Sequence, residues 1–358
     1  MGTSAQLTQV QTCLIVWQVY PGENLIEMTS GQTKLSLRSS LVIPEVNFGK
    51  NQTTVTEFIL LGFRGLQSFK IPVFLLLLIF HLVTLSGNLL IIWLVVSNKA
   101  LRSPMYFFLT HLSLSDIFLT SNIIPEALWL IWHDGGTMSF SRCIVQFYFF
   151  ASSEASECLI LSVMAYDRYL AICYPLRYNY LMNPVLCSML VSISWLLSFF
   201  AVLTDTVSIT QLQFCGPNTI DHFFCDLAPI LDLSCSDTTF IEIELLILCI
   251  PVAVFPLLVI VVSYIYIVLA VLRISSKSGR RKTFSTCSSH LTVVSIFYGT
   301  LIGIYMLPAK RKSLNVSKVS SLLYTVLTPM MNPIIYSLRN NDIHEAMKKC
   351  GFMLALVP

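Results

Sequence analysis

The sequence predicts an all-α membrane protein: a bundle of seven transmembrane helices with a short C-terminal amphipathic helix. Of the 358 residues, 55% are hydrophobic and only 11% are charged, which is more apolar than a soluble core of this length requires. Seven apolar stretches are long enough, at about 20 residues each, to cross a bilayer. The net charge of +3 is too small to indicate a nucleic-acid partner, and the basic residues lie between the apolar stretches.

The predicted spans divide the chain into three parts. Residues 1–70 form a tail, of which 1–50 show no strong periodicity and are expected to be disordered. Residues 71–338 form the transmembrane domain, and residues 339–358 form a second tail. Because seven is odd, the two tails lie on opposite sides of the membrane. The spans cover residues 71–97, 106–132, 143–170, 186–206, 242–272, 287–307 and 319–338.

Basic residues indicate the orientation, because cytoplasmic loops are enriched in Lys and Arg. Twelve flank the spans on the side of the C-terminus, and five lie in the short loops opposite. We therefore expect a multi-pass protein of the plasma membrane with an extracellular N-terminus. Asn51 begins an Asn-Gln-Thr glycosylation acceptor in the first tail, and Asn315 begins a second candidate. The orientation does not explain why Lys318 and the basic residues at 310–312 gather after the sixth span.

Three cysteines lie in the long loop between the fourth and fifth spans: Cys215, Cys225 and Cys235. Their spacing is too wide for the C-x-x-C pairs of zinc sites. An extracellular loop lies in an oxidising environment, so disulfides are the better interpretation. Cys143 at the outer start of the third span allows three pairings with them, and the sequence leaves the choice open. His222, between these cysteines and beside Asp226, could belong to a metal site, but an ordinary hydrogen-bonded histidine is favoured.

Charged side chains inside a span cost about 3 kcal/mol or more, so each one indicates a function or a partner. Asp116 and Glu157 are the deepest, and two neighbouring carboxylates cannot both stay ionised in a low dielectric without a cation or a shared proton. We expect a bound sodium ion or a protonated Glu157. Asn88, Asn332 and Ser113 would supply further oxygens. The alternative is a purely structural hydrogen-bond network, and no other cofactor is expected.

Glu154 lies one helical turn before Glu157 on a similar face, nearer the extracellular side. We expect it to face a cavity in which a ligand could bind. Its carboxylate could pair with a cationic ligand. Alternatively, burial could keep it neutral and merely hydrogen-bonding, and this second interpretation is favoured.

Several longer motifs lie in or beside the spans. The third span ends in Asp167-Arg168-Tyr169, whose arginine can snorkel toward water or fold back onto Asp167. The others are Gly87-Asn88, PMYFFL at 104–109 leading to Leu114-Ser115-Asp116, MAYDRYLAIC at 164–173, Ser263-Tyr264, KTFSTCSSHL at 282–291 and PMMNPIIYSLRN at 329–340. In this order they resemble the vertebrate odorant (olfactory) receptors, a family of rhodopsin-like G-protein-coupled receptors, over residues 51–349. The sixth span reads FYGT at 297–300, as in odorant receptors, where other rhodopsin-like receptors carry Trp-x-Pro.

The resemblance implies two disulfides, Cys143–Cys225 and Cys215–Cys235. It also implies an odorant cavity between the third, fifth, sixth and seventh spans, mostly apolar as small volatile ligands need. The residues that the motifs align with its wall are Phe150, Ala151, Glu154, Ala155, Leu248, Val252, Leu301, Ile302, Tyr305, Leu322 and Thr325, with Tyr298 at the base. Glu154 departs from the small residue that is commoner in the family, which makes the ligand class less transferable. The long tail before Asn51 is a second departure.

The resemblance also implies a switch at the cytoplasmic end. Ligand binding would favour a state in which the sixth helix swings outward, and Pro333 would permit a bend near Asn332. The switch residues would be Asp167, Arg168, Tyr169, Tyr264 and Tyr336, with the basic stretch 280–282 facing the G protein. Coupling to a stimulatory, olfactory-type heterotrimeric G protein, with a rise in cyclic AMP, follows from the resemblance alone. The expected partners are a small volatile odorant, this G protein and membrane lipid.

Two other classes of membrane protein fit the sequence less well. A secondary transporter would show inverted repeats and paired broken helices, and the two halves of this chain show no self-similarity. An enzyme would carry a recognisable catalytic pattern, and no His-Glu-x-x-His, Gly-x-Ser-x-Gly or phosphate-loop motif is present. The chain is therefore not expected to be an enzyme.

Overall fold

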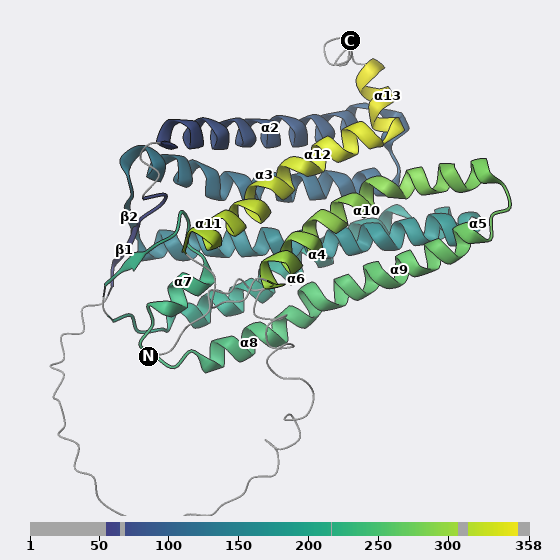
Figure 1. Cartoon of the computed structure of the whole chain (residues 1–358). Helices are drawn as coiled ribbons and strands as arrows, with labels where there is room; N and C mark the ends of the chain where they lie inside the picture. The colour runs from purple at the N-terminus through teal and green to yellow at the C-terminus, as the bar shows by residue number, and fades with distance from the viewer. Residues whose placement is uncertain (1–54, 65–68, 216, 307–313, 350–358) are drawn as a thin grey trace, which may run out of the picture.

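The computed structural model describes residues 55–64, 69–215, 217–306 and 314–349. The expected disordered tail (1–50) and the glycosylation acceptor Asn51 lie outside these ranges. Long helices run side by side along one axis (Figure 1). All seven predicted spans are helical over their described residues, which confirms this prediction. In chain order they are α2 (Lys70–Ser97), α3 (Pro104–His133), α4 (Phe140–Cys173), α6 (Pro184–Thr210), α8–η4–α9 (Thr239–Cys249, Ile250–Val254 and Phe255–Leu272), α10 (Lys277–Met306) and α11–η6–α12 (Leu314–Leu322, Leu323–Leu327 and Thr328–Arg339).

The two ends of the bundle carry different elements, and we name them accordingly. At the sheet end, β1 (Glu57–Leu60) lies between β2 (Gly136–Ser139), to which it is antiparallel, and β3 (Thr219–Ile220), to which it is parallel. The short helix α7 (Leu227–Asp232) also lies at this end (Figure 1). At the C-terminal end lie η3 (Lys99–Leu101), α5 (Pro175–Leu181) and α13 (Asn341–Lys349).

Local sequence signals explain where several helices begin and end. Pro184 occupies the first turn of α6, where its missing N–H costs nothing. Asn183 caps the same helix, because its side chain accepts a hydrogen bond of 2.9 Å from the Leu186 N–H. Helix α3 ends at His133 and is followed by Asp134, whose backbone is left-handed at φ 58°, and by Gly135 at φ 110°. This tight turn leads directly into β2.

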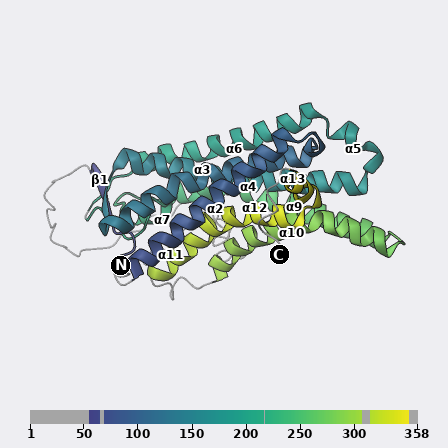
Figure 2. The ribbon, with the colours of Figure 1, turned by 90° about the horizontal axis from the view of Figure 1, so that it is seen from above.

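Four helices in the described ranges suit a membrane by length and composition: α2, α3, α6 and the continuous α8–η4–α9 span. Large apolar side chains such as Ile71, Val96 and Leu196 are well exposed on their outward faces. The third span, α4, is more polar because it lies within the bundle and packs against α3, α6 and α9 (Figure 2). Its side chains therefore contact protein more than lipid.

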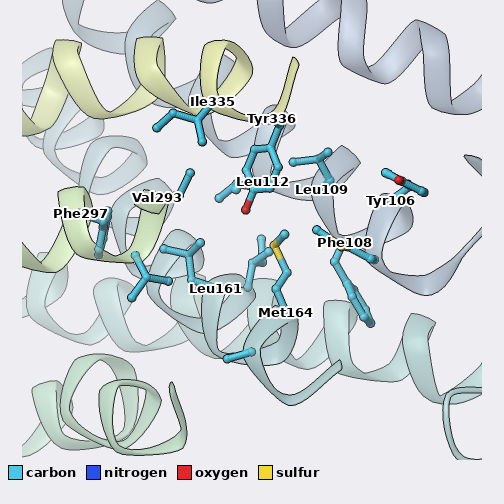
Figure 3. Close-up of a cluster of buried hydrophobic side chains, with 14 of the residues drawn as sticks. Tyr106, Phe108, Leu109, Leu112, Leu161, Met164, Val293, Phe297, Ile335 and Tyr336 are labelled. Atoms are coloured by element: carbon cyan, nitrogen blue, oxygen red, sulfur yellow. The ribbon is translucent and has the colours of Figure 1, made fainter. Parts of the chain in front are cut away.

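Two clusters of buried side chains fill the bundle. The cluster in the C-terminal half joins α3, α4, α10 and α12, and in it Tyr336 points from α12 toward Leu161 and Met164 of α4 (Figure 3). The cluster in the sheet-end half includes Phe58 of β1 and Phe223 of the loop after β3, both fully buried. The small sheet is therefore part of the core.

The predicted amphipathic helix after the seventh span is confirmed as α13. Ile343 and Met347 are buried on one face of this helix, whereas Lys348 is exposed. The Tyr106 hydroxyl at the start of α3 donates a 2.7 Å hydrogen bond to the Asp342 carboxylate. This bond fastens the beginning of α13 to the bundle.

A close approach between α2 and α12 depends on Gly87. A Cβ atom added at Gly87 would lie 2.9 Å from both Cβ and Cγ of Pro333. Because the proline ring is rigid, the two helices would have to move apart to admit a larger side chain.

Gly87→Ala should therefore destabilise the protein by about 1 to 3 kcal/mol, the usual cost of overpacking a core, and lower its melting temperature in detergent. Gly299→Ala is the matched control, since a Cβ atom there would meet nothing within 4 Å and alanine favours a helix by about 1 kcal/mol. Thermal unfolding of both purified variants gives the comparison. Equal melting temperatures would contradict the importance of this contact.

Candidate functional site

A narrow cavity lies in the sheet-end half of the bundle, between α4, α6 and the junction of α8 with η4. Its volume is small, about 20 Å³. Glu154 of α4 is the one ionisable acid or base in its wall, and the other wall residues are small or aliphatic. The wall consists of Ala151, Glu154, Ala155, Ala201, Val202, Leu248, Cys249, Val252 and Ala253. Such a site suits a small, largely apolar ligand with one polar anchor.

The wall overlaps in part with the residues expected from the sequence. Those in common are Ala151, Glu154, Ala155, Leu248 and Val252. The expected cavity used the third, fifth, sixth and seventh spans, whereas this one uses the fourth span in place of the sixth and seventh. Ala201 and Val202 of α6 are small enough to leave space opposite α4.

Three other expected wall residues are packed elsewhere. The Phe150 ring meets the Phe224 ring of the loop after β3 edge to face, with centroids 5.0 Å apart. Tyr298 and Leu301 of α10 belong to the buried cluster in the C-terminal half. These three side chains therefore pack against other side chains, and none of them lines the cavity described above.

The remaining expected residues belong to α10 and the last span. Leu322 lines a second, open groove of about 550 Å³ between α2 and the α11–η6 segment. Thr325 is fully buried, and its hydroxyl donates to the Ser321 carbonyl at 2.7 Å. The backbone of Ile302 and Tyr305 is helical, and their side chains lie outside the described part of the chain.

Two disulfides hold the loop between α6 and α8. Cys143–Cys225 joins the start of α4 to the loop, with Cα atoms 5.4 Å apart. Cys215–Cys235 joins two parts of the loop, with Cα atoms 5.6 Å apart. These are the pairings that the resemblance implied. With Cys225 bonded to Cys143, its sulfur is not free to bind a metal ion beside His222, and no group of three or more His, Cys, Asp or Glu residues in the described ranges could hold one.

An ion pair with a buried lysine fastens this loop to the last span. The Lys318 ammonium donates to the Asp221 carboxylate at 2.5 Å and to the Gly62 carbonyl at 2.7 Å. His222 is buried beside this pair, with Nε2 3.2 Å from the Ser321 hydroxyl. Burial and the nearby Lys318 lower the pKa of His222 to about 3. The imidazole is therefore neutral, and its contacts fit an ordinary hydrogen-bonded histidine.

Asp226 places a second buried acid near the cavity. Its carboxylate caps α7 by accepting a 2.8 Å hydrogen bond from the Leu227 N–H. Burial raises the pKa of Asp226 to about 7, although hydrogen bonds from Leu227 and Tyr324 act in the opposite direction. Asp226 lies close enough to Glu154 for their negative charges to repel. The region around the cavity is therefore one of negative potential whenever both acids are ionised.

At the other end of α4, Arg168 is held by its neighbour in the sequence. Its Nε donates to the Asp167 carboxylate at 2.9 Å, and its Nη2 contacts the same oxygen. The Tyr178 hydroxyl of α5 donates to the other oxygen of Asp167 at 2.7 Å. The arginine thus folds back onto Asp167 instead of reaching toward water. Tyr169, next along the helix, packs against Tyr266 of α9 with ring centroids 5.7 Å apart.

A second set of contacts ties α10 to α4 and α9. Nε2 of His290 lies 3.1 Å from the Leu161 carbonyl oxygen, and its Nδ1 lies 2.7 Å from the Tyr264 hydroxyl. A carbonyl only accepts, so the proton lies on Nε2, and the Tyr264 hydroxyl donates to Nδ1 of the neutral ring. The buried Tyr336 hydroxyl, in the same half of the bundle, has no hydrogen-bond partner within the described ranges. Of the expected switch residues, Tyr264 is thus joined to α10 and α4 through His290.

A polar layer around Asp116 lies between the two apolar clusters. The Asn332 amide donates to both oxygens of the Asp116 carboxylate, at 2.9 and 3.1 Å, and Glu157 lies within hydrogen-bonding reach of the same group. Oε1 of Glu157 and Oδ1 of Asn88 are buried acceptors without a donor in the described part of the chain. Two acids in contact need a proton or a cation between them. These unsatisfied oxygens fit either one.

Comparison with known proteins now decides the family. The family model described as olfactory receptor matches residues 77–353, most of this chain. The chain belongs to the olfactory receptor family. Human olfactory receptor 11L1 is 45% identical over 309 residues, which cover 85% of this chain and 96% of the relative. Mouse olfactory receptor 5G9 is 47% identical over 298 residues, which cover 83% and 95%.

A solved structure supports the fold of this olfactory receptor independently. The crystal structure of squid rhodopsin matches it with a TM-score of 0.62 at 17% identity, covering 79% of this chain and 85% of that chain. The rhodopsin-like seven-helix fold is therefore confirmed. The family consists of receptors and not of enzymes.

Some functional residues of this olfactory receptor were not predicted from its sequence. Ala201 and Val202 gave no signal, because small apolar residues are common in any span. Asp226 could have been found, since an acid directly before a helix is a typical N-cap. His290 lies within the KTFSTCSSHL motif, yet nothing in the sequence indicated that its ring would bridge α10 to Leu161.

The buried Asp226 predicts a dependence of stability on pH. Its pKa in the folded receptor is about 7, against 3.8 for an ordinary aspartate. The stability contributed by its proton is complete below pH 3.8 and is lost as the pH rises through about 7. Asp226→Asn keeps the N-cap but cannot ionise. Between pH 6 and pH 8, the melting temperature of the unmodified receptor should therefore fall relative to that of this variant. If the difference between the two melting temperatures in purified protein does not change with pH, the effect is ruled out.

Proposed function

We propose that this olfactory receptor binds a small volatile odorant in the cavity between α4, α6 and the α8–η4 junction. The bound state activates a stimulatory, olfactory-type heterotrimeric G protein, which raises cyclic AMP. The observation that supports this best is that one helix, α4, carries both a residue of the cavity wall and the arginine of the expected switch. Glu154 of α4 lies in the wall of the cavity, and Arg168 near the other end of α4 is held by Asp167 and Tyr178.

The same proposal assigns the two ends of the bundle to the two sides of the plasma membrane. The sheet end carries both disulfides, which form and persist on the oxidising, extracellular side. The loops at the C-terminal end carry twelve of the basic residues that flank the spans, as cytoplasmic loops do. The N-terminus is then extracellular, and the G protein docks at the C-terminal end.

We further propose that a sodium ion binds in the polar layer between Asp116 and Glu157. The buried acceptor oxygens of Glu157 and Asn88 that lack donors support this. The ion would offset one of the two negative charges and stabilise the resting arrangement. Replacing sodium with choline at constant ionic strength should then lower the melting temperature of the purified receptor. If it does not, a proton shared by the two acids replaces the ion.

The function is tested by measuring cyclic AMP in cells that express the receptor with an olfactory-type stimulatory G protein, against a mixed panel of odorants. At least one odorant should raise cyclic AMP. Arg168→Ala should abolish the response at unchanged surface expression. Ala201→Phe, which fills the cavity from α6, should abolish or strongly weaken the response to odorant while leaving ligand-independent activity in place.

Two results would overturn the proposal. If the receptor reaches the cell surface but no odorant of the panel raises cyclic AMP, the proposed chemosensory role is overturned. Uptake of a labelled ligand into the cells, without any G-protein activation, would instead favour a transporter.

A further inference from the structure

Among the buried acids of the described ranges, Glu154 differs because no hydrogen bond or ion pair is found for its carboxylate. Its side chain is 5% exposed and lies in the wall of the cavity. Within the described ranges no hydrogen bond or ion pair reaches its carboxylate. By contrast, Asp116 accepts from Asn332, and Glu126 accepts from Arg142 at 2.6 Å. Burying an acid without a hydrogen-bond donor costs free energy. A buried acid in a cavity wall therefore indicates that a ligand supplies the donor or the positive charge.

Among the residues that the structure describes, the cations at the sheet end already have partners other than Glu154. Lys318 is bound to Asp221, Arg142 to Glu126, and Lys70 to Asp134 at 2.8 Å. The other side chains in the wall of the cavity carry no positive charge. Arg64 donates to the Asp134 backbone carbonyl at 3.3 Å. The positive charges described near this end therefore contact groups other than Glu154.

The charged groups closest to Glu154 are acids. Glu157 lies one helical turn further along α4, and Asp226 approaches from the loop. Both repel a negative charge at Glu154 and attract a positive one within the cavity. A neutral or anionic odorant would leave this repulsion unrelieved, whereas a cationic odorant would relieve it.

We infer that the odorants of this receptor are small amines, whose protonated ammonium group pairs with Glu154 while their alkyl part contacts the aliphatic wall. The inference rests on the proposed function, because it names the ligand class for the same cavity. The small volume of the cavity, about 20 Å³, restricts these ligands to the most compact amines. Ala151, Ala201 and Val252 supply the apolar surface on which the alkyl part lies.

The test compares primary alkylamines with the alcohols and carboxylic acids of the same chain length, at a pH where the amines are protonated. The measurements are cyclic AMP in cells expressing the full-length receptor and the melting temperature of the purified receptor. An amine should act at concentrations about 10 to 100-fold lower than the matching alcohol, the usual range for a hydrogen bond to a charged group. The matching acid should be inactive.

Substitutions at Glu154 provide the second arm. Glu154→Gln keeps the shape but removes the charge, so it should abolish the preference for amines over alcohols at normal surface expression. Glu154→Asp keeps the charge and should preserve part of the preference. Glu244→Gln is the matched control: Glu244 is an acid of α8 that already accepts a 2.6 Å hydrogen bond from Ser208, and its substitution should leave the preference unchanged.

The outcomes separate this inference from the proposed function. A response to alcohols or aldehydes that equals the response to amines, and that Glu154→Gln does not alter, overturns the amine inference and leaves an odorant receptor. Absence of any response and of any thermal shift with every ligand overturns both. A preference for amines that survives Glu154→Gln shows that another group recognises the ammonium and also overturns the inference.

Discussion

Replacing Cys143 and Cys225 together with serine should leave almost no receptor at the cell surface. This disulfide joins residues separated by 82 positions, and the entropy of closing a loop of that length corresponds to about 4.5 kcal/mol. It also holds the fully buried Phe223 and Phe224 against the start of α4. Its loss therefore loosens the sheet-end core, and surface expression, measured with an N-terminal epitope tag, should fall by about tenfold or more.

The second disulfide is the matched control. Cys215 and Cys235 are separated by 20 positions and are exposed, so closing this loop corresponds to about 3.3 kcal/mol and fastens no buried ring. Serine at both positions should reduce surface expression clearly less than serine at Cys143 and Cys225. Equal losses would mean that the two bonds act through the loop as a whole and not through the core beneath it.

His290→Phe should raise the cyclic AMP that the receptor produces without ligand. In the structure His290 joins α10 to the Leu161 carbonyl of α4 and to the Tyr264 hydroxyl of α9. Phenylalanine keeps a ring of similar size but makes neither hydrogen bond. Two hydrogen bonds are worth about 2 kcal/mol, which corresponds to a change of about 30-fold in the ratio of closed to open states. Without these hydrogen bonds, we expect α10 to swing outward more often.

Two further variants sharpen this result. Tyr264→Phe removes one of the two hydrogen bonds of His290 and should give an intermediate rise in ligand-independent cyclic AMP. Ser295→Ala is the matched control, because this hydroxyl donates only within α10, to the Leu291 carbonyl at 2.7 Å, and its loss should have no effect. If His290→Phe signals like the unmodified receptor at equal surface expression, these bonds do not hold the closed state.

The long elements were predictable because each one depends on a local property of the chain. An apolar run of about 20 residues predicts a span wherever it occurs, and all seven runs are helices in the structure. The strands were not predicted. β1 is only four residues long, and its partners β2 and β3 lie far along the chain. Short strands of this kind are specified by backbone hydrogen bonds and by the packing of Phe58, which local periodicity does not reveal.

The site residues that could be predicted are those whose side chains cost free energy to place inside a span. The others could be predicted less well. Glu154 and Asp116 were identified because acids are expensive inside a span. The contribution of α6 to the cavity depends instead on missing volume at Ala201 and Val202, which is a property of the assembled bundle. One member of the unexplained basic cluster now has a structural role, because Lys318 binds Asp221 and the Gly62 carbonyl. The basic residues at 310–312 lie outside the described ranges.

The continuity of α4 has a mechanical consequence. Glu154 and Arg168 lie on one helix that is unbroken from Phe140 to Cys173, and at 1.5 Å per residue they are about 21 Å apart along its axis. The fifth and seventh spans, by contrast, each contain a π-helical turn, η4 and η6, and such turns are local irregularities in the helical pitch. The third span, α4, is therefore the rigid axis of the bundle, and the fifth and seventh spans have a built-in point at which their angle to α4 can change.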